Sequence, residues 1–452
     1  MSSAATEIKE NKMGAMPINK LLFSMSVPMI ISMMVQALYN IVDSAFVAQI
    51  SENALSSVSL AFPMQNFMIA VAAGTGVGTN ALLSKSLGAK KFDTANKTAS
   101  VSILLAFLNW LIFVIIAFLF TTPFLKGQTE VLEIIQGGEV YLHIVLVGSL
   151  GIFIQVAMER LLQSTGRTFE AMICQGVGAI ANIILDPILI FGLFGLPEMG
   201  VAGAAIATVI GQFISCGVGI YLNLTRNHEI HIRIKNALPS IYILRSIYIV
   251  AIPSILMISI GSIMIFYMNR ILDSFTSTAI AVFGVYFKLQ SFIFMPVFGI
   301  NNGMIPIIAY NYGARNKQRI HQTIKLSVIA AVVIMLAGFA AFQILPYKLL
   351  ALFKASDNMV AIGVPALRII SFSFLLAGYN IVTSSVFQAL GNGIYSLIIS
   401  VVRQLVVLLP AAYLLSRTGE LNHVWLAFPI AEIVALALCT AYLIRILKKL
   451  DF

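Results

Sequence analysis

Charged residues are scarce in this chain. Asp, Glu, Lys and Arg together make up 10% of its 452 residues, whereas apolar types make up 59%. A typical soluble domain carries about 25% charged residues, which cover its surface. Intrinsic disorder is excluded as well, because it requires low hydrophobicity and high net charge. The composition therefore predicts a membrane protein that crosses the bilayer several times.

Cysteine and histidine are also rare. The three cysteines, Cys174, Cys216 and Cys439, lie in apolar segments, and an odd number of them argues against disulfides or a thiolate metal site. The chain has no HExxH motif, and among its five histidines only His143 lies deep in an apolar segment. These absences disfavour a membrane-embedded enzyme and a bound metal. Residues 1–16 lack the apolar core of a signal peptide, so we expect a short cytoplasmic tail.

Long apolar runs, in contrast, are abundant. A helix needs about 20 apolar residues to cross the hydrocarbon layer of a bilayer. Twelve runs meet this requirement, and they leave no room for a soluble domain. We place them at residues 21–43, 54–82, 98–120, 138–160, 170–195, 200–224, 244–270, 278–310, 324–346, 360–387, 394–416 and 423–446. The predicted fold class is an all-α polytopic membrane protein with twelve transmembrane helices.

The net charge of +10 agrees with a definite membrane topology. If the N-terminus lies in the cytoplasm, most Lys and Arg residues fall in segments that return to that side. The residues on the opposite side are Lys126, Arg270, Lys348, Lys354 and Arg417. This bias follows the positive-inside rule, so we expect both termini in the cytoplasm. The basic excess then needs no nucleic-acid partner.

The sequence repeats itself at an offset of 225 residues. The matched pairs are Pro28 with Pro253, Gly88 with Gly313, and QSTG at 163–166 with QALG at 388–391. Each pair occupies the same place relative to the apolar runs. The chain therefore consists of two halves with six spans each, in parallel orientation and related by a pseudo-twofold axis along the membrane normal.

This duplication predicts the domain organisation. After the tail at 1–16 we expect an N-terminal six-helix bundle at 17–226, a cytoplasmic linker at 227–239 and a C-terminal six-helix bundle at 240–452. Two such bundles suit alternating access to a central site. A channel would more naturally be an oligomer with a pore loop, and an enzyme has no need of matched halves.

The first span carries a polar stripe. Its residues Gln36, Tyr39, Asn40 and Asp43 are spaced i, i+3, i+4 and i+7, which places them on one face of an otherwise apolar helix. Polar residues at membrane depth rarely face lipid. We therefore expect this face to line a cavity or to meet a partner helix.

The fifth span carries Asn182 and Asp186, one helical turn apart, followed directly by Pro187. Proline inside a helix removes a backbone hydrogen bond, so Pro187 is a candidate helix-bending position. A carboxylate in a low-dielectric cavity can hold a proton or a cation, but not comfortably both. This competition is sufficient for antiport, and Asp43 and Asp186 are the candidate acids.

The second half lacks these acids, since the repeat offset leads from them to Met268 and Ala411. The ionisable residues in its spans are Lys288, Arg368, Arg403 and Glu432. We expect that Arg403 and Glu432 could pair with each other, as a structural contact. The asymmetry suggests that ion coupling belongs to the first half and that the second half contributes to substrate contacts.

Several polar residues are candidates for a substrate cleft. Tyr379, Asn380 and Thr383 share one face of the tenth span, and Lys288 lies deep in the eighth. Gln36 and Asn40 complete this set from the first half. The 19 Met and 30 Phe residues can form surfaces that adapt to varied ligands, and aromatic faces attract organic cations.

Four segments share a wider pattern. They are LYNIVDSAFVAQ at 38–49, SLGAKKFDTA at 86–95 with its echo NYGAR at 311–315, and ANIILDPILIFGLFGLPEMGVAGAAIATVIGQ at 181–212. Together they resemble the multidrug and toxic compound extrusion (MATE) family, from about residue 17 to residue 449. The segment at 283–315 is similar to bacterial exporters of its DinF-like branch.

The resemblance implies a V-shaped pair of bundles in the cytoplasmic (inner) membrane of a bacterium. Such proteins export cationic lipophilic drugs and dyes in exchange for H⁺ or Na⁺, and thereby confer antibiotic resistance. In DinF-like members a tyrosine and an acid of span 1 form the coupling site with an Asn and an Asp of span 5. Tyr39, Asp43, Asn182 and Asp186 match these positions. The acids that bind Na⁺ on spans 7 and 10 of the NorM-like branch are absent, which favours proton coupling.

The resemblance also implies a monomer embedded in lipid, with no cofactor apart from the coupling ion. Two alternatives remain, a Na⁺-coupled drug exporter and a flippase for lipid-linked sugars from the same superfamily. A flippase would need a strongly cationic cleft for a diphosphate. The deep basic residues Lys288, Arg368 and Arg403 are scattered over three spans, which gives it little support.

Overall fold

A computed structural model describes residues 11–233, 238 and 240–450. Residues 1–10 of the expected tail, and residues 234–237 and 239 of the expected linker, lie outside this part of the chain. Where the structure describes the chain, its regular elements are all helices, so the all-α fold class is confirmed.

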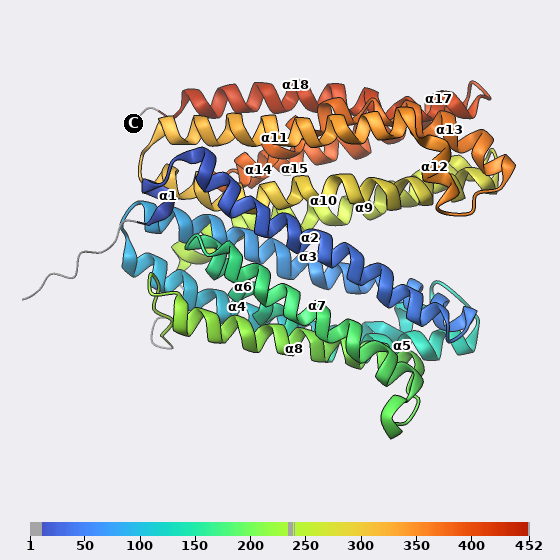
Figure 1. Cartoon of the computed structure of the whole chain (residues 1–452), viewed down its shortest axis with the longest axis horizontal. Helices are drawn as coiled ribbons and strands as arrows, with labels where there is room; N and C mark the ends of the chain where they lie inside the picture. The colour runs from blue at the N-terminus through green and yellow to red at the C-terminus, as the bar shows by residue number, and fades with distance from the viewer. Residues whose placement is uncertain (1–10, 234–237, 239, 451–452) are drawn as a thin grey trace, which may run out of the picture.

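The first half of the chain forms one layer of helices, which lies in the lower part of Figure 1. Its elements are α1 (Lys12–Ala15), α2 (Ile18–Ala48), α3 (Glu52–Gly88), α4 (Phe92–Lys126), α5 (Leu132–Val147), α6 (Leu150–Ser164), α7 (Thr168–Phe191), the 3₁₀ turn η1 (Leu193–Gly195) and α8 (Gly200–Arg226). We call the group from α2 to α8 the first bundle.

The second half forms the upper layer in Figure 1. Its elements are α9 (Ile241–Asp273), α10 (Ser277–Gly313), α11 (Lys317–Ile344), α12 (Pro346–Ala351), α13 (Asp357–Ser371), α14 (Phe374–Ala389), α15 (Gly393–Val401), the π-helical turn η3 (Val402–Leu408), α16 (Leu409–Ser416), α17 (Leu421–Trp425) and α18 (Ala427–Lys448). We call the group from α9 to α18 the second bundle.

The membrane-spanning helices agree with the predicted runs. Among the described residues, 10 helices are long and apolar enough to cross a membrane, or up to 12 if each of two bent pairs counts as one span. The bent pairs are α5 with α6, at 45°, and α13 with α14, at 51°. Their breaks follow Val147 and Ser371, close to one repeat apart, so the duplication extends to the shape of the helices.

The helices are longer than the predicted spans, because polar residues extend them beyond the apolar runs. For example, α3 was expected at 54–82 but spans Glu52–Gly88. The Ser51 side chain caps its first turn by accepting a hydrogen bond from the backbone of Ala54. At the other end a turn follows in which Lys90 has a φ of 56°.

The two bundles meet along related helix pairs. α2 packs against α10, and α3 packs against both α9 and α10. Glycine lets these backbones touch: a Cβ atom on Gly303 of α10 would lie 2.8 Å from the Cα of Ser26 on α2. One repeat earlier, a Cβ atom on Gly78 of α3 would overlap the carbonyl oxygen of Ile247 on α9. The contact between the bundles therefore depends on the absence of these side chains.

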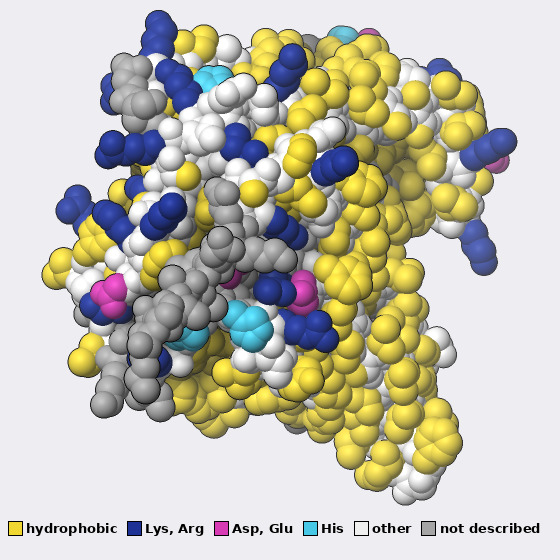
Figure 2. Space-filling model, turned by 60° about the vertical axis from the view of Figure 1, so that its left-hand side comes forward, with side chains coloured by type: hydrophobic (Ala, Val, Ile, Leu, Met, Phe, Trp, Pro, Cys, Tyr) yellow, Lys and Arg dark blue, Asp and Glu magenta, His cyan; other side chains and the backbone are white. Residues whose placement is uncertain are grey.

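The end of the molecule that holds α1 and the last turn of α18 is rich in Lys and Arg, as Figure 2 shows for the face turned forward. We call it the basic end. Here α1 touches both bundles. The carbonyl oxygen of Met13 accepts hydrogen bonds from Asn311 and Arg319 of the second bundle, at 3.1 and 2.9 Å. On the other side, the Asn11 amide donates to the carboxylate of Glu229, which follows the first bundle.

Candidate functional site

Two carboxylic acids meet inside the first bundle. Asp43 of α2 and Asp186 of α7 interact directly through their side chains. Asp186 is completely buried, and the Oδ1 atom of Asp43 is a buried oxygen without a hydrogen-bond partner. Each acid comes from the polar face of its own helix, and the packing of α2 against α7 brings the two together.

Asn182 holds Asp186 in place. The side-chain amide of Asn182 can form a hydrogen bond with each of two neighbours in one of its two orientations. In this orientation its Nδ2 donates to Asp186 Oδ2 at 3.0 Å, and its Oδ1 accepts from the backbone N–H of Thr208 on α8 at 3.1 Å. The hydroxyl group of Tyr39 on α2 lies close to the side chain of Thr208 and to Asp43. The four residues that match the coupling site of the family therefore lie in one cluster, which we call the acid cluster.

The helix that carries Asp186 continues without a break past Pro187 as far as Phe191. The breaks sharper than 40° that the structure describes lie in α5–α6 and α13–α14 instead. A bend at Pro187 therefore stays a prediction about movement.

Tyr141 of α5 is a neighbour of the acid cluster that the sequence did not indicate. It is buried, its hydroxyl group donates to Gln65 Oε1 at 3.3 Å, and it is close enough to interact electrostatically with Asp43 and Tyr39. Gln65 and Tyr141 are isolated polar groups on different helices, so neither forms a stripe. Only the packing of α3 against α5 shows that they belong together.

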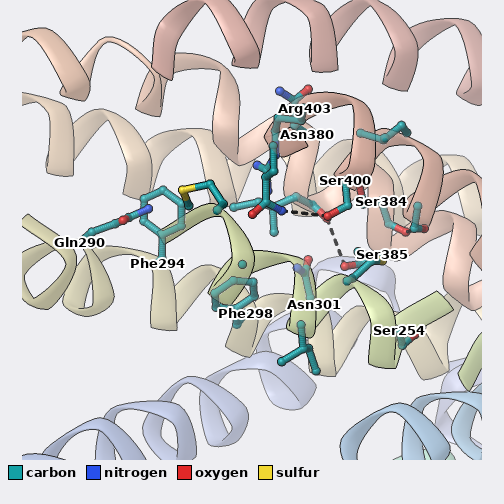
Figure 3. A pocket seen from close by; sticks show the side chains of 18 of the residues that line it. Ser254, Gln290, Phe294, Phe298, Asn301, Asn380, Ser384, Ser385, Ser400 and Arg403 are labelled. Carbon is teal, nitrogen blue, oxygen red and sulfur yellow. Dashed lines mark hydrogen bonds between the residues drawn. The ribbon is translucent and has the colours of Figure 1, made fainter. Parts of the chain in front are cut away.

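The second bundle encloses a cavity of about 580 Å³ (Figure 3). Its walls come from α9, α10, α14, α15, η3 and α18, and α3 of the first bundle closes one side. The labelled residues of α10 are Gln290, Phe294, Phe298 and Asn301, and those of α14, α15 and η3 are Asn380, Ser384, Ser385, Ser400 and Arg403. Because both bundles contribute to the wall, a movement of one against the other would change the cavity.

A charged pair lies in the wall of this cavity. Arg403 Nη1 donates to Glu432 Oε1 at 2.8 Å, and Asn380 Nδ2 donates to Glu432 Oε2 at 2.6 Å. The pairing of Arg403 with Glu432 expected from the sequence is thus confirmed. Both carboxylate oxygens of Glu432 are occupied by donors.

Comparison with known proteins agrees with this architecture. The sequence model of the MatE family matches residues 28–188 and 251–414, which is more than half of the chain. The chain belongs to the MATE family. Two similar relatives are named multidrug export protein MepA. The one from Staphylococcus haemolyticus (strain JCSC1435) is 27% identical over 429 residues, or 94% of each chain. The one from Staphylococcus aureus (strain MRSA252) is 27% identical over 435 residues, or 95% of this chain and 94% of the relative.

Solved MATE structures share the whole fold. One is described as the outward-facing conformation of a multidrug resistance MATE family transporter of the MOP superfamily. It matches with a TM-score of 0.92 and 27% identity, over 98% of this chain and 99% of the other. A MATE structure in the straight conformation also has a TM-score of 0.92, with 26% identity over 97% and 98% of the two chains.

Most cleft candidates of this MATE protein lie outside the walls of the cavity. Asn380 is in the wall, whereas the hydroxyl group of Tyr379 bonds to Thr440 at 3.1 Å. Thr383 is buried and its hydroxyl oxygen has no hydrogen-bond partner. Lys288 is exposed, with its Nζ 6.0 Å from the ring of Phe353. That Lys288 faces a substrate cleft stays a prediction.

The polar stripe of α2 divides between different surroundings. Gln36 Oε1 accepts a hydrogen bond from Gln175 Nε2 of α7 at 2.9 Å, so it contributes to packing within the first bundle. Asn40 is exposed. The helical spacing correctly placed Tyr39 and Asp43 together, but it does not distinguish a partner helix from an open surface.

Proposed function

We propose that this MATE protein exports amphiphilic, mainly cationic drugs from a bacterial cell in exchange for protons. The contact between Asp43 and Asp186 inside the first bundle carries the proposal. Two carboxylates in contact in a low-dielectric interior do not both carry a charge, so the pair keeps a proton that can be exchanged. Asn182 anchors Asp186, which leaves Asp43 as the acid that can turn toward a ligand.

The position of α2 explains how a proton would affect drug binding. This helix packs against α7, which carries Asp186, and against α10 of the second bundle. A change in the contact between Asp43 and Asp186 therefore acts on a helix that also forms the contact between the bundles. This arrangement supports alternating access, in which protonation and drug binding favour different arrangements of the same two bundles.

The expected topology places the basic end in the cytoplasm of the cell, on the inner side of its cytoplasmic membrane. The bundles touch through glycines near this end, and the fold is similar to that of an outward-facing transporter. We therefore assign the structure to the state that is closed toward the cytoplasm.

A sugar flippase has less support. Lys288 is exposed, and Arg403 is paired with Glu432, so the deep basic residues do not gather into a cationic cleft. Sodium coupling differs from proton coupling only in the ion, and it is decided by experiment.

The test uses purified protein in liposomes, with the lipophilic cation rhodamine 123 as substrate. We expect a pH gradient to drive dye transport in the absence of Na⁺. Asp186→Asn and Asp43→Asn should abolish it, because an amide cannot exchange a proton. Asp273→Asn is the matched control, since this aspartate is exposed at the end of α9.

Transport driven by a Na⁺ gradient alone would replace the proton with sodium in this proposal. Transport that ignores both gradients, or that survives in Asp186→Asn, would show that the acid cluster does not couple it.

A further inference from the structure

The turn between α7 and α8 projects from the first bundle. It lies at the end opposite the basic end, and it points away from the second bundle (Figure 1). Residues 192–199 of this turn read GLFGLPEM, with Glu198 as the one charged residue among them. Phe194 is 90% exposed, Leu193 45% and Leu196 44%. We call these three residues the apolar tip. Water is an unfavourable environment for adjacent apolar side chains, so the tip indicates a contact with another partner.

The backbone of the tip is unfavourable for the residue that occupies it. Phe194 has a φ of 59° and a ψ of 26°, in the left-handed region. A bulky side chain rarely adopts this region, because its Cβ atom comes close to a carbonyl oxygen of the backbone. Backbone strain of this kind occurs mainly where it serves a function.

The internal repeat offers a direct comparison. The offset of 225 residues maps α7 onto the segment from the start of α15 to the end of α16. The same offset maps Phe194 onto Gly419, whose φ of 79° lies in the same left-handed region. Glycine adopts this region without strain, so the second bundle has the residue that the turn favours. The conformation of the turn therefore does not explain the phenylalanine of the first bundle.

The two corresponding turns also differ in polarity. Residues 417–424, which match 192–199 at this offset, read RTGELNHV and include Arg417, Glu420 and His423. The expected axis along the membrane normal places both turns at the same depth. Depth alone therefore does not explain why the first turn is apolar.

The tip follows a helix that is long enough to reach the lipid headgroups. α7 has 24 residues, and a rise of 1.5 Å per residue makes it about 36 Å long. The hydrocarbon layer of a bilayer is about 30 Å thick. Arg167, the N-cap of α7, keeps its charged group at the polar boundary on the side of the basic end. The last turn of α7 then lies near the headgroups of the opposite leaflet.

The apolar surface of the tip continues that of the neighbouring spans. α7 and α8, the two helices that hold the tip, expose apolar side chains such as Ile184 and Phe213. Since the turn projects sideways from the bundle, the lipid that surrounds these helices also lies beside the tip. Phospholipid is therefore the partner that fits both the position and the composition of the tip.

We propose that Phe194, with Leu193 and Leu196, inserts into the phospholipid leaflet opposite the basic end and anchors the last turn of α7 there. The side chains lie at the boundary between headgroups and acyl chains, where aromatic residues are favoured. The anchor holds one end of the helix that carries Asp186 at a fixed depth. It needs neither a drug nor a gradient, so it stands apart from the proton coupling proposed above.

Tryptophan fluorescence of the full chain in phosphatidylcholine liposomes tests the position of the tip. Phe194→Trp keeps an aromatic ring as the probe, and the two native tryptophans, Trp110 and Trp425, are replaced by phenylalanine. Phosphatidylcholine that is brominated on its acyl chains quenches a tryptophan in lipid, whereas iodide on both sides of the membrane quenches one in water. We expect strong quenching by the brominated lipid and little by iodide. Glu420→Trp, at an exposed position of the corresponding turn, is the matched control and should show the reverse.

A second probe leaves Phe194 in place. Leu196→Trp reports on the tip while Phe194 is either retained or changed to serine. This change should lower the ratio of inserted to solvated tip by about ten- to a hundredfold, the factor expected for burial of one phenylalanine side chain. Quenching should then shift from the brominated lipid to iodide. Because Phe194 is almost fully exposed, the fold should be unaffected, which size-exclusion chromatography and thermal melting confirm.

An independent measurement avoids the change at the buried Trp425. A nitroxide on Phe194→Cys, in a background in which the three native cysteines are replaced by alanine, reports its depth through collisions with oxygen and with a water-soluble nickel chelate. We expect oxygen to collide with it more often than the chelate does. A nitroxide on Glu420→Cys should show the opposite preference.

Quenching of Phe194→Trp by iodide and not by brominated lipid would overturn the proposal, because the tip would then lie in water. Protection from both quenchers that increases with the ratio of protein to lipid would overturn it as well, since a second copy of the chain would then cover the tip. So would equal quenching by lipid at Glu420→Trp, because depth alone would explain the result. A Leu196→Trp signal that is unaffected by Phe194→Ser would show that Phe194 is not the anchor.

Discussion

Replacing Gly303 by alanine should shift this protein from the state described here toward the one that opens at the basic end. The new Cβ atom would lie 2.7 Å from the Oγ of Ser26 and 2.8 Å from its Cα and N. Ordinary van der Waals contact begins at 3.4 Å, so α10 and α2 must separate locally by about 0.6 Å. Two of these three atoms belong to the backbone, so a side-chain rotation cannot relieve the overlap.

The size of the effect follows from the packing. Overpacking of this kind costs about 1–3 kcal/mol. The cost applies only where the two helices touch, because the overlap disappears when the bundles separate at this end. The population ratio of the two states should therefore change by about 5- to 150-fold. Gly78→Ala, one repeat earlier, should act in the same direction against the carbonyl oxygen of Ile247.

The assay is the distance between spin labels on Asp93→Cys and Gln318→Cys, two exposed positions that follow the turns after α3 and α10. The three native cysteines are buried and free, and they are replaced by alanine in the background protein. Pulsed electron paramagnetic resonance then gives the distance distribution in lipid nanodiscs. We expect a longer distance to gain population in Gly303→Ala.

Gly284→Ala is the matched control. It lies on the same helix as Gly303, but a Cβ atom there would have no heavy atom within 4 Å. Alanine should favour the helix by up to about 1 kcal/mol without changing the distance distribution. If Gly303→Ala and Gly284→Ala give the same distribution, close backbone contact does not hold the basic end closed.

Two further predictions concern the same end of the molecule. Arg160 Nη1 donates a hydrogen bond to Gln163 at 2.9 Å and another to Asn302 of the second bundle at 3.0 Å. Arg160→Gln removes this contact between the bundles, so it should lengthen the distance between the spin labels, as Gly303→Ala does. Arg226→Gln is the control and should leave that distance unchanged. Burial raises the pKa of Glu229, although Asn11, Arg167 and Lys12 act in the opposite direction. The contribution of this carboxyl group to stability therefore falls as the pH rises above 4.5, the ordinary pKa of a glutamate, because the group must then be charged while buried. Glu229→Gln should raise the melting temperature relative to the original protein at about pH 8 but not at about pH 4. A difference independent of pH would contradict this reasoning.

The positions of the helices could be predicted because each membrane span is a local property of the chain. A run such as 98–120 contains enough apolar residues to cross a bilayer, and α4 contains it entirely. The bends were not predictable in the same way. The break between α5 and α6 falls at Gly148 and Ser149 without a proline, and η3 forms in the sequence VRQLVVL, which contains neither proline nor glycine. Both depend on the packing of neighbouring helices.

The acid cluster was partly predictable. Helical spacing placed Asp43 with Tyr39, and Asp186 with Asn182, on separate faces. Nothing in the spacing could show that Asp43 meets Asp186, because that contact joins helices more than 100 residues apart in the chain. For the same reason the sequence did not indicate Tyr141, which lies on a third helix.

The sequence by itself determined what depends on composition and order along the chain: the membrane environment, the spans, the two matched halves and the polar residues within them. The spans and the membrane environment follow from the transfer of each segment from water to lipid, which is a local free energy, and the halves follow from the repeat in the sequence. Only the tertiary structure decided which of those polar residues meet. Helix packing brings Asp43 to Asp186, pairs Arg403 with Glu432 and leaves the cavity beside that pair, because contacts between distant helices are determined by the shapes of all their neighbours.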